Sequence, residues 1–380
     1  MRVMISCGEV SGDLYAGALA AELRARVPSL EIVGFGGRQL QAAGATLTGT
    51  FTGLTVTGLT ESVRVLPRSW LMYRRLVDEA RKRRPDVFVA IDFSDFNFHL
   101  MSALRQMGIT IVYYVSPQLW AWRPGRIEKM KRCVDKVLVI FPFEAPLYER
   151  AGIPVQFVGH PLLDLARVGQ PRSTFLSGFG LEPDAPTVAL LPGSRPNELR
   201  RIAPVMAAAI PLIRARVPDV QFVAARAPNL SDDLFEPFGP AVVIVDDRTD
   251  DVIAASDVVI TASGTATVQT ALHERPMVVV YRLSPLTYRI GKPFVRVDMY
   301  AMVNLVAGRR IVPELIQSDF TPERVAEETT TLLTNTERQA STREALKDVR
   351  ERLGSPGASG RAADAILEVA GRTSHGSSSA

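Results

Sequence analysis

The chain has 380 residues, of which 47% are hydrophobic and 22% are charged, and its 44 basic and 40 acidic side chains leave a net charge of +4. This length is sufficient for two domains with a core each, and the composition excludes a largely disordered protein. The small net charge gives no support for nucleic-acid binding, and an aromatic content of 7% disfavours a base-stacking surface.

The cysteines and histidines exclude two further classes of protein. Cys7 and Cys133 lie far apart in the sequence, which argues against a disulfide scaffold or a cysteine-ligated zinc site. No two of the four histidines have the spacing of a helical metal pair. The first residues contain too short an apolar run for a signal peptide, and no stretch of about 18 apolar residues predicts a membrane span. We therefore expect a cytoplasmic protein with reduced cysteines and without a bound metal or cofactor.

Short hydrophobic runs alternate with helical patterns in the first half of the chain. A continuous apolar run without polar alternation is typical of a parallel strand that is buried on both faces. Such runs separated by helices predict a doubly wound α/β domain, which we place at residues 1–165. The predicted strands are 2–7, 31–36, 86–92, 110–116 and 136–141, and the predicted helices are 13–27, 61–84, 95–107 and 143–151.

The second half repeats this pattern after a connector at 166–186 that is rich in Pro, Gly and Ser. We expect a second Rossmann-like domain at 187–355, a C-terminal helix at 356–371 and a disordered tail at 372–380. Two such domains facing a cleft would bind ligands beyond the carboxyl ends of their strands. The predicted strands are 187–191, 220–225, 242–246, 258–262 and 277–281, and helical patterns follow at 321–336, 338–353 and 361–370.

The loop after the first predicted strand reads GEVSGD (8–13). Its two glycines allow a tight turn and close approach of a ligand, and the following helix offers free N–H groups. A first turn of this kind also occurs for purely structural reasons, but Glu9, Ser11 and Asp13 in one turn favour a functional role. The nicotinamide fingerprint G-x-G-x-x-G is absent, which argues against a dehydrogenase.

Two aspartates follow the strand predicted at 86–92. Asp92 ends the strand, where a buried carboxylate is costly unless it is used or paired. Asp95 stands where the N-cap of the next helix is expected, so a structural role is the better interpretation for it. We therefore choose Asp92 as the candidate general base. The next loop, SPQLWAWR (116–123), contains two tryptophans that either pack in the core or form the wall of an acceptor pocket.

Two loops of the second domain suit a diphosphate. Residues 192–195 form a glycine turn that leads into a helix with an arginine at its mouth, and a guanidinium can bind two phosphate oxygens. It is not a Walker A loop, because no G-K-[ST] sequence follows. Small residues at 262–267 begin another helix and would let an anion reach the backbone, and Gln269 lies one turn beyond Thr265.

The segment 62–84 combines aromatic and aliphatic residues with many arginines, a composition suited to anionic lipid headgroups. An ordinary amphipathic core helix with a solvated basic face is the alternative interpretation. We favour membrane contact, and the candidate residues are Val65, Leu66, Trp70, Leu71, Arg74 and Arg75.

Together these loops resemble those of the lipid-A-disaccharide synthases, which are GT-B glycosyltransferases of family 19. The matching stretches follow the family's order over nearly the whole chain: GEVSGD (8–13), AIDFSDFN (90–97), YVSPQLWAWR (114–123), FVGHPLLD (157–164), LLPGSR (190–195), ASGTAT (262–267), VVYRLSP (279–285) and MVNLVAGRRIVPEL (302–315).

The resemblance implies an inverting, metal-independent transferase of lipid A biosynthesis. UDP-2,3-diacylglucosamine would donate its sugar to the 6-hydroxyl of 2,3-diacylglucosamine 1-phosphate (lipid X), giving the β-1′,6 disaccharide 1-phosphate and UDP. It also implies a peripheral enzyme on the cytoplasmic face of the inner membrane, in contact with its anionic surface. A homodimer through exchanged C-terminal elements is a further implication.

The resemblance and the chemistry together suggest roles for individual residues. Asp92 is the expected base and Glu9 the reserve. Gln269 stands where the family usually has Glu, and its amide can still hydrogen-bond ribose. We expect acceptor contacts from Ser11, Gly12, Asn97, Ser116 and Trp120. We expect the UDP-sugar to contact Gly193, Ser194, Arg195, Ser263, Gly264, Thr265, Gln269 and, by family match, Arg282 and Asn304.

Two other functions are alternatives for the same residues. A UDP-N-acetylglucosamine 2-epimerase shares the architecture, but such enzymes carry an early G-T-R-P-E loop and several active-site histidines. A non-catalytic UDP-sugar or membrane-binding module is the third hypothesis. For His160, in the turn GHP, either a ligand contact or a structural role is open, and we slightly favour the structural one.

Overall fold

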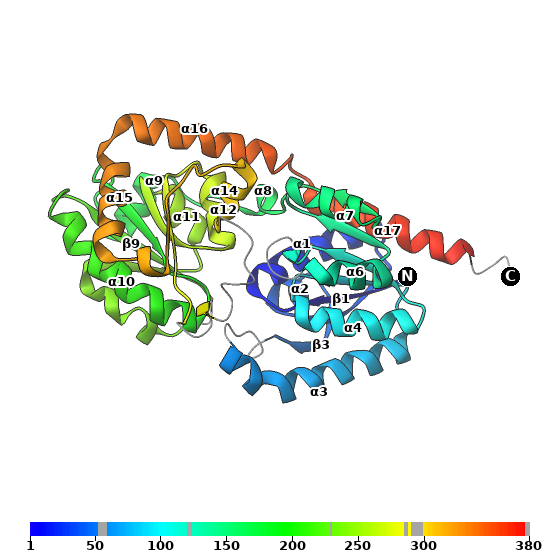
Figure 1. The fold of residues 1–380 in the computed structure, drawn as a ribbon. Helices are drawn as coiled ribbons and strands as arrows, with labels where there is room; N and C mark the ends of the chain where they lie inside the picture. Colours follow the sequence, from blue (N-terminus) through cyan, green and yellow to red (C-terminus); the bar gives the residue numbers. More distant parts are fainter. Residues whose placement is uncertain (52–58, 120–123, 229, 285–287, 290–298, 377–380) are drawn as a thin grey trace. The chain divides into compact units, whose positions relative to one another are not determined.

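The computed structural model describes residues 1–51, 59–119, 124–228, 230–284, 288–289 and 299–376, without the side chains of 59–65 and 372–376. The chain divides into two compact units, each built on one parallel sheet with helices on both faces (Figure 1). The first unit consists mostly of Met1–Leu163 and Leu353–Ala380, and the second mostly of Asp164–Lys292 and Val297–Arg352. The C-terminal segment thus belongs to the first unit.

The sheet of the first unit has seven strands in the order β3-β2-β1-β4-β5-β6-β7, all parallel. The central strands are completely buried because their sequences are continuous apolar runs that helices cover on both sides. The chain winds outward from β1 to β3 and then returns to β4 on the other side of β1, so the order reverses between β1 and β4. The strands are β1 (Arg2–Cys7), β2 (Glu31–Gly36), β3 (Thr46–Thr50), β4 (Val87–Ile91), β5 (Thr110–Tyr114), β6 (Lys136–Val139) and β7 (Val155–Phe157).

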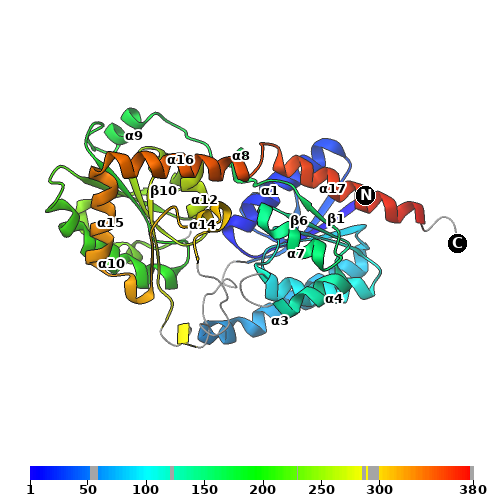
Figure 2. The ribbon, with the colours of Figure 1, turned by 45° about the horizontal axis from the view of Figure 1, so that its top comes forward.

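The last helix of the chain packs against the first (Figure 2). Arg26 of α1 pairs with Asp364 of α17, and the Arg361 guanidinium donates to three carbonyl oxygens, including that of Val158 at 2.8 Å. The helices of this unit are α1 (Val10–Arg26), α2 (Arg38–Ala42), α3 (Leu59–Arg83), α4 (Ser94–Gln106), α6 (Ile127–Cys133), α7 (Ala145–Arg150) and α17 (Ala358–Gly376), with 3₁₀ turns η1 (Pro124–Arg126) and η2 (Pro142–Glu144).

The sheet of the second unit has six parallel strands in the order β10-β9-β8-β11-β12-β13, and its order reverses between β8 and β11. The strands are β8 (Thr187–Leu191), β9 (Gln221–Arg226), β10 (Val242–Asp246), β11 (Val258–Ala262), β12 (Met277–Tyr281) and β13 (Glu314–Ile316). The helices are α9 (Arg172–Gly178), α10 (Pro196–Arg214), α11 (Thr249–Ala254), α12 (Thr265–Leu272), α14 (Met302–Ala307), α15 (Pro322–Thr334) and α16 (Thr336–Arg352), with 3₁₀ turns η3 (Asp232–Leu234), η4 (Glu236–Ala241) and η6 (Gln317–Asp319). The short helix α8 (Leu162–Leu165) contains the boundary between the two units.

The predicted pair of doubly wound parallel sheets is confirmed, and all ten predicted strands are present. Three further strands, β3, β7 and β13, did not appear in the sequence analysis. Each lies at the edge of its sheet and has five residues or fewer, so it carries no long apolar run. The prediction of an N-cap at Asp95 is wrong, because α4 begins at Ser94 and Asp95 lies in its first turn, paired with Arg126. No described helix has the length and apolar character needed to cross a membrane.

His160 is completely buried in the first unit. Its ring lies edge-on to Tyr15 with centroids 5.9 Å apart and 5.2 Å from the ring of Phe141, and Nδ1 accepts a hydrogen bond of 3.2 Å from the amide of Leu162. Burial lowers the pKa of His160 to about 3, so the ring is neutral and fills a core position. These contacts favour the structural role for His160.

We expect His160 to make the first unit less stable in acid. Its pKa is about 3 when folded and about 6.5 when unfolded, so the unfolded chain takes up a proton as the pH falls below about 6.5. The stability that depends on a neutral ring is complete above that pH and should have fallen by about 2 kcal/mol at pH 5. Urea unfolding of wild type and His160→Gln at pH 7.5 and pH 5 measures this, because Gln does not titrate. An equal stability difference at both pH values would contradict the prediction.

Candidate functional site

Glu9 and Asp92 follow the two strands between which the order of the first sheet reverses. Cys7 at the end of β1 and Ile91 at the end of β4 are register partners, so Gly8 and Asp92 leave the sheet from neighbouring positions. Glu9 occupies the N-cap of α1 and is partly exposed, as is Asp92. In open α/β sheets this reversal is where ligands bind. The structure thus brings the two predicted catalytic carboxylates to one edge of one sheet.

The backbone at this edge is strained. Asp92 and Phe93 have φ angles of 45° and 48°, and Val115, after the neighbouring β5, has a φ of 58°. Positive φ is uncommon outside glycine and most unusual for a β-branched residue such as valine. The Asp92 amide donates to the Val115 carbonyl at 3.3 Å, so the two strained turns are bonded to each other. Strained residues of this kind cluster at functional sites, which supports the choice of Asp92.

Two side chains hold the main-chain carbonyl of Asp92. Asn97 donates to it from Nδ2 at 2.9 Å, and Tyr113 donates from its hydroxyl at 2.7 Å. Asn97 is completely buried, and its Nδ2 also lies 3.4 Å from the carbonyl oxygens of Ser6 and Ile91. The sequence suggested an acceptor contact for Asn97, whereas this burial favours a role in shaping the turn that carries Asp92.

Gly8 is needed because the ring of Phe93 occupies the space where a side chain would lie. A Cβ on Gly8 would be 2.1 Å from Cγ of Phe93. That ring stacks on Phe96 and Phe35, with centroids 5.1 Å and 6.1 Å away. The end of β1 and the turn after β4 therefore fit against each other with no room for a methyl group.

The other predicted residues of the first unit differ in their surroundings. Ser11 is partly exposed and Gly12 is buried. The buried carboxylate of Asp13 accepts hydrogen bonds from the amides of Gly37, Gln39 and Leu40 at 2.7, 2.8 and 3.2 Å, so it holds the start of α2. Ser116 is buried and bonded to the hydroxyl of Tyr148. Trp120 lies outside the described residues.

Neither the thiol nor the phenol next to this edge competes with the carboxylates as a base. Burial raises the pKa of Cys7 well above its usual value, and the negative charges of Asp13 and Asp92 raise it further. Burial is the largest cause that raises the pKa of Tyr113 well above its usual value, and the negative charge of Asp92 is the next. Both groups therefore stay protonated at neutral pH, so neither is a candidate for the base.

In the second unit, two predicted phosphate loops also flank the reversal of strand order. β8 leads through Gly193 and Ser194 into α10, and β11 leads through Ser263 and Gly264 into α12. The two strands are neighbours, with Leu191 and Thr261 in register. Gly193 and Gly264 have φ angles of 124° and 149°, which favour glycine, and neither N-cap residue, Arg195 or Gly264, caps its helix with a side chain. The positive ends of both helix dipoles can therefore attract an anion, although Pro196 at the first position of α10 has no N–H to donate.

Arg195 stands at the N-cap of α10 and is held there by an acidic partner. Its Nη1 lies 2.9 Å from Oε1 of Glu198, which is nearly buried and also accepts from the Tyr281 hydroxyl at 3.3 Å. A Cβ on Gly193 would lie 2.9 Å from the other carboxylate oxygen of Glu198. Glu198 therefore fixes both the guanidinium and the shape of the turn, a role that the sequence analysis missed.

The remaining residues that were predicted to bind the UDP-sugar fall into two groups. Gln269 is partly exposed one turn into α12, and Ser263 donates from its hydroxyl to the carbonyl of Tyr300 at 3.2 Å. Arg282 instead donates to the carbonyls of Gln317 and Phe320 and lies over the Phe320 ring. Arg282 thus shapes the segment after β13 in this conformation.

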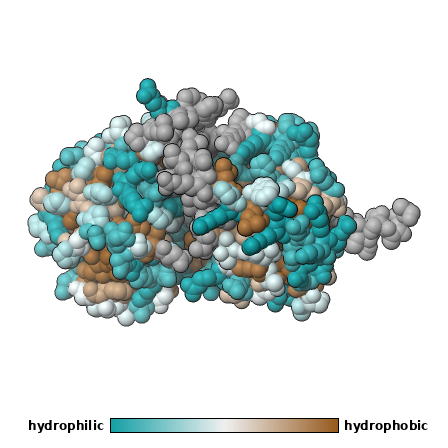
Figure 3. Space-filling view, turned by 90° about the horizontal axis from the view of Figure 1, so that it is seen from below, coloured by the Kyte–Doolittle hydropathy of each residue, from teal (hydrophilic) through white to brown (hydrophobic). Residues whose placement is uncertain are grey.

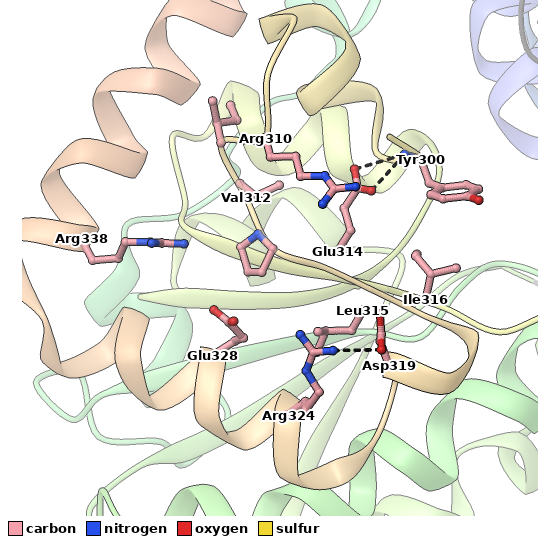
Figure 4. Close-up of a pocket in the computed structure, with 12 residues that line it drawn as sticks. Tyr300, Arg310, Val312, Glu314, Leu315, Ile316, Asp319, Arg324, Glu328 and Arg338 are labelled. Carbon is pink, nitrogen blue, oxygen red and sulfur yellow. Dashed lines mark hydrogen bonds and ion pairs between the residues drawn. The ribbon is translucent and has the colours of Figure 1, made fainter. Parts of the chain in front are cut away.

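Asn304 is completely buried, and both ends of its amide are bonded within the chain. Nδ2 donates to Oε1 of Glu314 at 2.7 Å and to the carbonyl of Val312 at 3.1 Å, while Oδ1 accepts from the amides of Ile311 and Val312. Glu314 also accepts from the amide of Tyr300 (Figure 4) and from that of Ala301. Glu314, which the sequence analysis did not single out, therefore joins Asn304 to the segment that meets the Ser263 loop.

A cavity of about 360 Å³ lies beside this network, along the edge strand β13 (Figure 4). Its charged lining includes Arg324 and Asp319, which pair at 3.0 Å, and Glu314 with its amide partners. Tyr300 lines the cavity and also accepts the hydrogen bond from Ser263. None of the residues that were predicted to bind the UDP-sugar lines this cavity. The candidate donor site is therefore the pair of loops after β8 and β11.

Comparisons with known proteins agree with this arrangement. The family model described as lipid-A-disaccharide synthetase matches residues 3–369. The lipid-A-disaccharide synthase of Geobacter metallireducens is 42% identical over 378 residues, 98% of each chain. The UDP-GlcNAc 2-epimerase of Neisseria meningitidis, solved with UDP-GlcNAc, has a TM-score of 0.70 at 12% identity over 97% of this chain and 100% of its own. The calicheamicin glycosyltransferase CalG4 has a TM-score of 0.62 at 16% identity over 98% of both chains. These two structures show the GT-B fold.

We predict that Gly8→Ala destabilises the first unit by about 1–3 kcal/mol, because the new methyl group would overlap the ring of Phe93. Gly12→Ala is the matched control. Its Cβ would lie 3.5 Å from Cβ of Cys7, an ordinary contact, and alanine is the better helix former. Urea unfolding of both variants tests the prediction, and equal stability of the two would contradict it.

Proposed function

Because the chain belongs to the lipid-A-disaccharide synthase family, we propose that it joins UDP-2,3-diacylglucosamine to 2,3-diacylglucosamine 1-phosphate. The products would be the β-1′,6-linked disaccharide 1-phosphate and UDP. The observation that carries this proposal at the level of residues is the position of Asp92, in a strained turn where the order of the first sheet reverses.

The proposed reaction needs one base and one stabilised leaving group. The 6-hydroxyl of the acceptor attacks C1 of the donor sugar, a new O6–C1 bond forms, and the bond from C1 to the diphosphate oxygen breaks. The proton of the hydroxyl passes to the carboxylate of Asp92, and UDP leaves with the electron pair. Attack opposite the leaving group converts the α linkage of the donor to β. Glu9, at the N-cap of α1 on the same edge, is the reserve base.

The second unit would bind the nucleotide through its two phosphate loops. The dipoles of α10 and α12, whose N-termini lie at these loops, and the guanidinium of Arg195 would stabilise the charge that develops on UDP, without requiring a metal. Ser194, Ser263 and Thr265 would add hydroxyl donors. Gln269 would hydrogen-bond the ribose, since its amide both donates and accepts. Arg282 and Asn304 would support this site by fixing the segments around β13.

The first unit would bind the acceptor at the edge that carries Asp92. Ser11 and Gly12, in the turn and first residues of α1, lie on the same edge as Glu9. Ser116 follows β5, the strand next to β4. We propose direct contacts for Ser11, with Gly12 allowing close approach of the ligand, and a role for Asn97 through the main chain of Asp92.

We also propose that α3 contacts the anionic cytoplasmic face of the inner membrane. Leu66, Trp70 and Leu71 are 60%, 59% and 48% exposed, so they do not pack in a core. Leu76, Val77 and Ala80 on the same helix are buried and anchor it to the sheet. Hydrophobic and hydrophilic residues lie intermixed on this face of the unit (Figure 3).

The basic residues of α3 complete the proposed membrane surface. The Arg74 guanidinium lies 4.9 Å from the centroid of the Trp70 ring, and Arg75 is exposed. Exposed apolar side chains beside arginines suit acyl chains below anionic headgroups, which is also where both lipid substrates would reside. The side chain of Val65, predicted for the same surface, lies outside the described part of the chain. A homodimer through C-terminal elements stays a prediction.

The epimerase alternative has less support. The likeness to the Neisseria epimerase, at 12% identity, reflects a shared fold, whereas the relative at 42% identity over 98% of the chain is a lipid-A-disaccharide synthase. We therefore retain the transferase as the proposed function.

Asp92→Asn tests the proposed base. Asn cannot accept the proton, so turnover should fall by at least about a hundred-fold, while UDP-diacylglucosamine still binds. The measurement is UDP release from UDP-diacylglucosamine, with and without lipid X, in detergent with EDTA. Wild-type release that requires lipid X and persists in EDTA is the expected result.

Asp95→Asn is the matched control, since Asp95 is an exposed carboxylate three residues further on and is paired with Arg126. It should retain turnover within a few-fold of wild type. An Asp92→Asn rate within a few-fold of wild type would refute the base assignment. Folded protein that releases no UDP when given both substrates would refute the proposed reaction.

Replacing Leu66, Trp70 and Leu71 with Ser should move the protein from anionic vesicles to the soluble fraction. These exposed apolar side chains are the ones that would insert into the membrane from α3. Val168→Ser with Leu212→Ser is the control, since these exposed apolar residues lie elsewhere, at 48% and 37% exposure. Co-sedimentation with phosphatidylglycerol vesicles measures both. Unchanged sedimentation of the α3 variant would count against membrane contact through α3.

A further inference from the structure

We propose that Tyr113 is a positioning residue for the transfer reaction: its hydroxyl, together with Asn97, clamps the main-chain carbonyl of Asp92 and so fixes the carboxylate that takes the proton. This inference rests on the proposed function, in which Asp92 is the base. Tyr113 was not among the residues that the sequence suggested.

Tyr113 is placed for this role by the strand that carries it. It is the fourth residue of β5, completely buried, and its ring lies 6.3 Å from that of Phe98 on α4. From there its hydroxyl reaches across to the strand next to β5 and donates to the carbonyl of Asp92 at 2.7 Å. Nδ2 of Asn97 donates to the same oxygen at 2.9 Å. One carbonyl oxygen thus accepts from two side chains, which uses both of its lone pairs.

This carbonyl belongs to a residue that does not adopt its conformation by intrinsic preference. Asp92 and the following Phe93 both have positive φ, a region that costs a non-glycine residue energy and persists only where the surroundings impose it. The Asp92 carbonyl oxygen moves when this turn relaxes, so two donors converging on it oppose the relaxation. Because the carboxylate is attached to the same residue, fixing the carbonyl also fixes the Cα atom from which the carboxylate extends.

Tyr113 remains a hydrogen-bond donor over the whole working pH range. Burial is the largest cause of its raised pKa, and the negative charge of Asp92 is the next. The phenol therefore stays protonated while Asp92 is ionised, which is the state in which Asp92 acts as a base. The ring of Tyr113 is completely buried and leaves no surface for substrate, so we infer that its effect reaches the reaction through the hydrogen bond to the Asp92 carbonyl.

This arrangement makes a specific kinetic prediction for Tyr113→Phe, which removes one oxygen and keeps the ring. The turnover number kcat should fall about ten-fold, while KM for either substrate stays within about two-fold, because the binding surfaces are unaltered. In an Asp92→Asn background the same substitution should cause no further loss, since the residue that it positions has already lost its chemistry. UDP release by wild type, the two single variants and the double variant provides these four rates.

Tyr114→Phe is the matched control. Tyr114 is the neighbouring residue of β5, equally buried, with its side chain on the opposite face of the sheet. Its kcat should stay within about two-fold of wild type. The inference is overturned if Tyr113→Phe keeps wild-type kcat, if Tyr114→Phe loses as much, or if the Tyr113→Phe and Asp92→Asn losses multiply. A Tyr113→Phe chain that does not fold, judged by circular dichroism, would also overturn it by showing that the hydroxyl serves the whole sheet.

Failure of the proposed function gives a different pattern of results. If Asp92→Asn alone keeps turnover, the base assignment fails, and the role of Tyr113 fails with it whatever the other rates are. If Asp92→Asn is inactive and Tyr113→Phe is not impaired, the proposed function stands and the positioning role alone is overturned.

Discussion

The parallel pairing of β1 with β4, and of β8 with β11, is the constraint on which every candidate site residue depends. Main-chain hydrogen bonds fix the register of these pairs, with Cys7 opposite Ile91 and Leu191 opposite Thr261. Loops that are more than 60 residues apart in the sequence therefore begin from neighbouring positions at one sheet edge. The strands are buried on both faces, so this edge is a rigid base for residues whose conformations are otherwise unfavourable.

The two sheet edges hold their loops in different ways, and the chemistry that we propose for each edge differs accordingly. In the first unit, Asp92 and Phe93 adopt positive φ at a cost of about 1–3 kcal/mol each. Two side-chain hydrogen bonds to the Asp92 carbonyl stabilise this turn by about 1 kcal/mol each. The stacked rings of Phe35, Phe93 and Phe96 further oppose a change in the backbone conformation of the turn. In the second unit, glycines supply the turns without strain, and the N-termini of two helices provide the positive ends of their dipoles. A base needs a fixed carboxylate, whereas a diphosphate needs several convergent donors, and each edge is suited to one of these needs.

The sequence predicted the architecture well because buried parallel strands are long apolar runs with helices between them. It missed β3, β7 and β13, since edge strands are short and partly polar and lack that signal. It located both candidate sites through their glycine turns and through Asp92. It did not reveal Tyr113, Glu198 or Glu314, because a buried side chain that bonds backbone or another side chain has no characteristic spacing in the sequence. On α3 the composition showed apolar residues beside arginines, and only the exposure of Leu66 and Trp70 separated a surface stripe from a core face.

Asn97 and Asn304 lie in stretches that the sequence predicted to be functional, but their amides are bonded within the chain. Each is completely buried, and each bonds main-chain groups: Asn97 the carbonyl of Asp92, and Asn304 the backbone at Ile311 and Val312. A primary amide has two donors and an acceptor on a short side chain, so it can join segments whose own backbone groups the strands leave unpaired. Breaking such a buried hydrogen bond leaves its partner groups without a hydrogen bond to protein or water, and this lowers the stability of the fold by about 1–3 kcal/mol. We infer that both residues act on the candidate sites through the shape of the backbone, Asn97 through the turn that carries Asp92 and Asn304 through the segment that meets the Ser263 loop.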